Sequence, residues 1–170
     1  MATEDRQPKR AGPLPPGSIV CLPAVALGER LDEEISRAGR HNTPLSCLLV
    51  VIENLDELAK AHGSELSEQT LAYVGKTLRL ELRRFDRVGR PGVHELAVLL
   101  PGADGPRGEI VARRVLGRLR AIKVEADGTR RPLRISVGLA AWREDLSGEQ
   151  LLDQTRTAAQ RERGVEAIET

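Results

Sequence analysis

Two short segments made almost entirely of apolar residues constrain the fold of this chain most. They read LSCLLVVI at 45–52 and HELAVLLP at 94–101, and both are far shorter than the ~20 residues that span a bilayer. Short apolar runs that are rich in Leu and Val and bounded by proline or charge are typical of strands buried on both faces. We therefore expect a central sheet that is covered on both sides.

Segments with helical periodicity lie between the expected strands and would supply this cover. Apolar residues recur every three or four positions in these segments, which span residues 24–40, 54–85, 107–122 and 148–163. Gly63 and Ser64 divide the second segment into two helices, and Ser67 is a candidate N-cap for the second of these.

Turn signals predict two hairpins. The first spans 86–102 and turns around Pro91-Gly92, and the second spans 124–142 and turns at Asp127-Gly128. The resulting order α-β-α-α-β-β-α-β-β-α predicts an α/β sandwich, in which helices cover the faces of a central mixed, mainly antiparallel sheet.

Length and composition predict one domain at 19–166, preceded by a flexible N-terminal arm at 1–18 that is rich in Pro, Gly and charge. The 26 basic and 25 acidic residues give a net charge of +1, which argues against nucleic acid or a membrane surface as a partner. The chain has one Phe, one Tyr and one Trp, so we expect no aromatic platform for stacking bases.

The N-terminus lacks the apolar stretch of a secretory signal, which predicts a cytoplasmic protein. Cys21 and Cys47 match no zinc or redox spacing, and we expect both to be buried free thiols.

Three motifs in a shared order carry a resemblance to a known family. They are VVIENLDELAKAHGSELSEQTL at 50–71, LRLELRRFDRVGRPGVHELAVLLPGAD at 78–104 and LRISVGLAAW at 133–142. Together they resemble the GGDEF domain of diguanylate cyclases, enzymes that join two GTP molecules into cyclic di-GMP. The resemblance covers residues 22–164 and implies a nucleotide-cyclase-like fold with a ferredoxin-like core.

The metal-binding residues of that family are altered in this chain. The resemblance implies that two carboxylates on adjacent strands hold Mg²⁺ against the triphosphate. The first carboxylate position is Val51, and the family's G-G-D/E-E-F hairpin becomes Gly92-Val93-His94-Glu95-Leu96. A valine cannot coordinate Mg²⁺ and imidazole is a poor ligand for it, so we expect a catalytically inactive, degenerate domain without metal or cofactor.

Other positions of the nucleotide site are also changed. Ala59 and Lys60 stand where the family has an Asn-Asp pair, Glu68 keeps the acid that faces the base, and Arg163 lies near the position of a phosphate-binding lysine. A zinc half-site at His94 and Glu95 is not expected, because adjacent strand residues point to opposite faces.

One motif of the family is retained in full. Arg83 and Asp86 form an R-x-x-D motif six residues before Gly92, and in the family this inhibitory site binds cyclic di-GMP, often as an intercalated dimer. Arg83 would donate to phosphate and guanine O6/N7, and Asp86 would accept from the guanine N1–H and N2–H₂ edge. Arg87 and Arg90 would add positive charge, and stacking would come from guanidinium planes.

Two functional hypotheses therefore remain open. The first is a cyclic di-GMP receptor that signals to a protein effector. The second is a ligand-independent module for protein interaction or dimerisation, which an exposed apolar patch of Val51, Ala59 and Val93 would favour. Arginines near a helix C-terminus also complement the helix dipole, so the motif can persist without a ligand. Residual GTP binding or cyclase activity ranks below both hypotheses.

Overall fold

The computed structural model describes residues 21–169, and the predicted arm at 1–18 lies outside them. A five-stranded sheet has the order β1-β3-β4-β2-β7. Its strands are β1 (Cys21–Pro23), β2 (Leu45–Ile52), β3 (Arg87–Gly92), β4 (Glu95–Pro101) and β7 (Ile135–Ala141). The β1–β3 pair is parallel and the other pairs are antiparallel, which confirms the predicted mixed, mainly antiparallel sheet.

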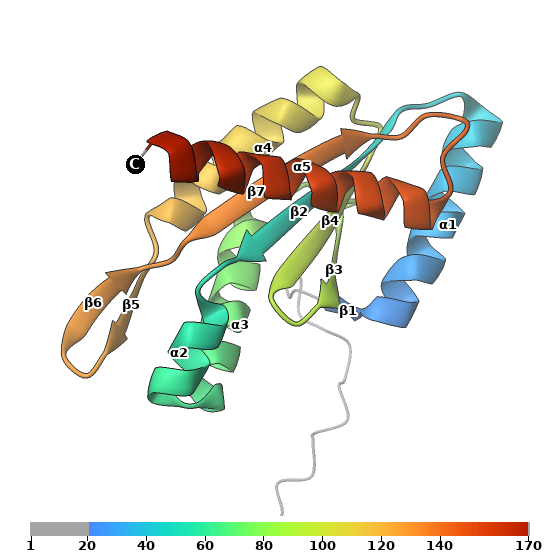
Figure 1. Cartoon of the computed structure of the whole chain (residues 1–170). Coiled ribbons are helices and arrows are strands. Elements are labelled where there is room, and N and C mark those ends of the chain that lie inside the picture. The colour runs from blue at the N-terminus through green and yellow to red at the C-terminus, as the bar shows by residue number, and fades with distance from the viewer. Residues whose placement is uncertain (1–20, 170) are drawn as a thin grey trace, which may run out of the picture.

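Five helices flank this sheet (Figure 1). They are α1 (Ala24–His41), α2 (Leu55–His62), α3 (Ser64–Leu80), α4 (Gly105–Arg120) and α5 (Gly148–Glu169). Buried side chains of α1 and α5 pack on one face of the sheet, and those of α2, α3 and α4 pack on the other. The predicted α/β sandwich is therefore confirmed.

Strand β2 illustrates why both faces are apolar. Leu48, Val50 and Ile52 point to the face covered by α2, α3 and α4, whereas Cys47 and Leu49 point to the face covered by α1 and α5. This is the two-residue alternation of a strand with a hydrophobic layer on each side. Burial raises the pKa of the Cys47 thiol to about 11. Cys21 is exposed, so the prediction that both thiols are buried was wrong for Cys21.

The β3–β4 hairpin turns at Val93-His94 and not at the predicted Pro91-Gly92. Gly92 still pairs with Glu95, and the register shifts between Gly89 and Gly92, so an irregularity in the strand accommodates the proline. The pairing with β1 ends at Arg90, and Pro91 therefore needs no N–H donor on that side.

The second predicted hairpin divides into two parts. β5 (Lys123–Ala126) and β6 (Thr129–Pro132) form a separate small sheet, whereas β7 joins the main sheet beside β2. The predicted turn is confirmed: Asp127 and Gly128 have φ angles of 52° and 75°, as both central residues of a type I′ turn require.

Two shorter features also differ from prediction. Ser67 lies inside α3, where its hydroxyl donates to the carbonyl of Ser64 at 2.8 Å, so it is not the N-cap of that helix. Strand β1 was not predicted, because three residues carry no periodicity.

Candidate functional site

Residues 83–86, the R-x-x-D motif, form a closed turn between α3 and β3. The backbone nitrogen of Asp86 donates to the carbonyl of Arg83 at 3.1 Å, as in a β-turn. The Asp86 carboxylate accepts from the Arg83 backbone nitrogen at 2.7 Å and from its Nη2 at 3.1 Å. The Asp86 side chain is 2% exposed and that of Arg83 is 55% exposed. The carboxylate therefore faces inward and holds the turn, while the guanidinium lies at the surface.

Hydrogen bonds from three arginines fix this turn to its surroundings. Arg79 donates to the carbonyls of Asp86 at 2.7 Å and Arg84 at 3.1 Å, and Arg87 donates to the Arg84 carbonyl at 3.1 Å. Arg83 Nη2 also donates to the carbonyl of Pro101 at the end of β4, at 2.8 Å. The turn is thus tied to α3, β3 and β4, and its shape is set before any ligand arrives.

The structure brings together Arg83, Asp86 and Arg87 but places Arg90 elsewhere. Arg90 donates to the carbonyl of Val93 at 3.1 Å, in the turn before β4 begins, whereas Arg83 contacts the last residue of that strand. A seven-residue strand is about 20 Å long, so the two guanidinium groups lie at opposite ends of the sheet.

Two side-chain contacts between polar groups hold the β3–β4 turn against α2 and α3. His94 Nε2 lies 3.1 Å from Asp56 Oδ2, and Arg90 Nη2 lies 3.1 Å from Glu68 Oε1. Glu68, which the resemblance implied would face the base, is therefore already paired with an arginine. His94 lies in the turn and not in a strand, so the strand-alternation argument against a zinc half-site does not apply to it. Across the described residues no group of three or more His, Cys, Asp or Glu side chains is arranged to hold a metal ion.

The residues at the family's metal position do not fit Mg²⁺. Val51 is half-buried and lies opposite Glu95 in the β2–β4 register. Glu95 in turn accepts hydrogen bonds from Nε and Nη2 of Arg156. These hydrogen bonds raise the pKa of Arg156. The carboxylate of the residue opposite Val51 is thus neutralised by a guanidinium and is not presented to a cation.

The apolar patch that would favour an interaction module is reduced to one exposed residue. Val93 is 66% exposed, whereas Val51 and Ala59 are half-buried. The side chain of Arg163 lies outside the part of the chain whose side chains are described.

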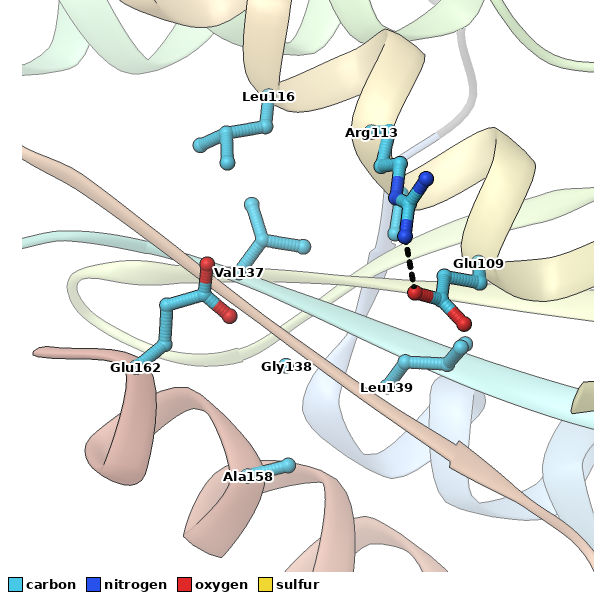
Figure 2. Close-up of a pocket in the computed structure, with 9 residues that line it drawn as sticks. Glu109, Arg113, Leu116, Val137, Gly138, Leu139, Ala158 and Glu162 are labelled. Carbon is cyan, nitrogen blue, oxygen red and sulfur yellow. Dashed lines mark hydrogen bonds and ion pairs between the residues drawn. The ribbon is translucent and has the colours of Figure 1, made fainter. Parts of the chain in front are cut away.

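A hollow of about 290 Å³ lies at the edge of the sheet, between α4, α5 and β7 (Figure 2). Leu116, Val137 and Leu139 line it, and an ion pair of 2.7 Å between Arg113 and Glu109 borders it. It contains none of the predicted site residues, so it is separate from the R-x-x-D turn.

One residue of the turn, Phe85, was not among the site residues predicted from the sequence. Phe85 lies between the two motif residues and is 72% exposed. The expectation that no aromatic platform exists rested on the count of aromatic residues and not on their positions. The position of Phe85 inside the R-x-x-D motif was the sequence signal that could have identified it.

The family follows from comparison with known sequences. The family model described as diguanylate cyclase, GGDEF domain, matches residues 25–164 of the chain. The chain belongs to the GGDEF domain family. A curated relative, diguanylate cyclase DgcP of Pseudomonas aeruginosa, is 26% identical over 137 residues, which are 81% of this chain and 20% of that protein. The GGDEF domain thus spans about a fifth of that relative's length.

Solved structures agree with this fold. The GGDEF domain of DgcB from Caulobacter crescentus, in complex with c-di-GMP (cyclic di-GMP), has a TM-score of 0.79 at 14% identity over 87% of this chain and 86% of that one. Diguanylate cyclase SiaD from Pseudomonas aeruginosa, in complex with its activator SiaC, has a TM-score of 0.78 at 23% identity over 84% and 55%. The nucleotide-cyclase-like fold that the motifs implied is therefore confirmed. No helix within residues 21–169 has the length and apolar character that crossing a membrane requires.

Proposed function

We propose that this GGDEF domain is a catalytically inactive c-di-GMP receptor that binds its ligand at the R-x-x-D turn and signals to a protein effector in the cytoplasm. The observation that carries the proposal is the closed turn, which holds Arg83 at the surface in a fixed position. The side-chain hydrogen bonds of Arg83 to Asp86 and Pro101 both come from its Nη2. Nε and Nη1 can therefore each donate a single hydrogen bond to a phosphate, whereas a bidentate contact with guanine O6 and N7 requires Nη2 to leave Asp86 or Pro101, because both two-donor edges of a guanidinium include Nη2.

The remaining residues of the predicted site take different parts in this proposal. Arg87 contributes positive charge beside the turn, and the buried Asp86 carboxylate holds the turn in shape. Contact between the Asp86 carboxylate and a guanine edge requires Arg83 Nη2 to move away from that carboxylate. Arg90 serves the β3–β4 turn, where it pairs with Glu68.

Inactivity is supported by the former metal position. A phosphoryl-transfer site needs oxyanions around its metal, and this one has a half-buried valine, a histidine paired with Asp56 and a glutamate bound by Arg156. Two proteins of the same fold support the binding parts of the proposal, since DgcB was solved with c-di-GMP and SiaD with a protein activator.

Calorimetric titration of c-di-GMP tests the receptor function. The wild-type chain is expected to give a saturable heat, and Arg83→Ala is expected to remove it, because the variant loses both the charge and the planar fork of donors. Arg83→Lys keeps the charge and is expected to bind weakly.

Arg113→Ala is the matched control. Arg113 is 80% exposed and pairs with Glu109 on α4, away from the turn. Its loss should leave binding unchanged. Absence of heat with the wild type at high micromolar ligand rejects the receptor function and leaves the ligand-independent interaction module as the better account.

A further inference from the structure

The two central residues of the R-x-x-D turn project away from the protein. The hydrogen bond between Asp86 and Arg83 closes a four-residue turn whose corner positions are Arg84 and Phe85. Both side chains are exposed, and Phe85 is the only phenylalanine of the chain. Leu80, at the end of α3, is 85% exposed and lies shortly before the turn.

The backbone of the turn is fixed, so Phe85 is held in this position. The carbonyls on either side of it, those of Arg84 and Asp86, each accept a hydrogen bond from Arg79. A ring on a rigid turn loses little conformational entropy when a ligand packs on it, which favours its use as a contact surface.

The groups around the ring have the chemistry of a nucleotide contact. Arg83 and Arg84 precede Phe85 directly, so an aromatic face and two cationic groups lie at one corner of the molecule. Sites for unpaired bases combine these elements: an aromatic ring stacks on the base while arginines neutralise the phosphates. The Asp86 carboxylate is buried and forms an ion pair with Arg83, so its negative charge repels an anionic ligand only weakly.

We propose that Phe85 is the stacking platform for a guanine base of c-di-GMP, and that Arg84 assists Arg83 at the phosphates. This inference rests on the receptor function proposed above and adds to it a stacking contact from an aromatic ring, which neither motif residue has. In this division of roles Arg83, Arg84 and Phe85 touch the ligand, while Asp86, Arg79 and Arg87 hold the turn.

The test is a calorimetric titration of c-di-GMP into the wild type and a series of variants at position 85. Phe85→Ala is expected to weaken binding about tenfold or more, since it removes a stacked ring. Phe85→Tyr keeps the ring and should bind as the wild type does. Phe85→Leu keeps apolar bulk without a π face and should resemble the alanine variant.

Tyr73→Ala is the matched control, because Tyr73 is also an exposed aromatic residue, at 59%, but lies on α3 away from the turn. It should leave binding unchanged. Equal affinity of wild type and Phe85→Ala, with binding still lost in Arg83→Ala, overturns the stacking role and keeps the receptor function. No binding by the wild type overturns both. Thermal unfolding of each variant verifies that it is folded, as expected for a change at an exposed side chain.

Discussion

Replacing Gly138 with alanine is expected to lower the free energy of unfolding by about 3 kcal/mol or more. Gly138 lies in β7 where α5 crosses it, and a Cβ there would overlap the backbone carbonyl of Thr155 and the backbone nitrogen of Ala159. These are main-chain atoms of a helix and cannot rotate away, so α5 would have to move off the sheet. In a chain of this size the loss corresponds to a fall in melting temperature on the order of 10 °C, measurable by calorimetry.

Gly117→Ala is the control for this prediction. Gly117 lies in α4, and nothing comes within 4 Å of the Cβ that alanine would add. Alanine is the better helix former, so this variant should gain up to about 1 kcal/mol. Similar melting temperatures for wild type and Gly138→Ala would contradict the close packing of α5 on β7.

Placing carboxylates at positions 51 and 94 is expected to create affinity for Mn²⁺ in the presence of GTP. Position 94 lies beside position 52, since the Ile52 nitrogen donates to the His94 carbonyl at 2.8 Å, and Val51 is opposite Glu95. The double variant Val51→Asp, His94→Asp therefore puts one carboxylate on β2 and a second in the β3–β4 turn beside it. Hard cations require such oxygen ligands, and we expect the affinity for Mn²⁺ to rise about tenfold or more over the wild type.

Titration followed by electron paramagnetic resonance measures free Mn²⁺ directly. The isosteric double variant Val51→Asn, His94→Asn has no added charge and should bind no better than the wild type. If the wild type bound Mn²⁺ as tightly as the aspartate variant, the absence of carboxylates at positions 51 and 94 would not support the proposed inactivity.

The layers of the fold could be predicted because each rests on a local pattern. The continuous apolar run at 45–52 predicted a strand covered on both faces, and β2 is that strand. Asp127-Gly128 predicted a turn, because both residues tolerate the positive φ that it requires. The first hairpin turn was predicted wrongly at Pro91-Gly92, because this pair of residues does not specify a turn alone. Proline and glycine are compatible with a turn and with an irregular strand beside a short neighbour, and pairing with β1 and β4 decided between the two.

The site was predicted less completely, because its contacts join residues far apart in the sequence. The R-x-x-D spacing identified Arg83 and Asp86, but not that the carboxylate would be buried as the closing group of a turn. The pairing of Arg90 with Glu68 joins β3 to α3, and Arg156 reaches Glu95 from α5. No local periodicity encodes such pairs. His62, at the end of α2, is only 13% exposed and lies 3.0 Å from Asp127 of the β5–β6 hairpin, which is another contact between distant residues.

Incubation of the wild-type chain with GTP and either Mg²⁺ or Mn²⁺ tests the central claim most directly. This claim is that a member of a cyclase family has lost its chemistry together with its metal ligands, Val51 and His94 standing in their place. Nucleotide chromatography is expected to recover the GTP unchanged, with no c-di-GMP above an enzyme-free blank. Formation of c-di-GMP in proportion to protein concentration would contradict the account.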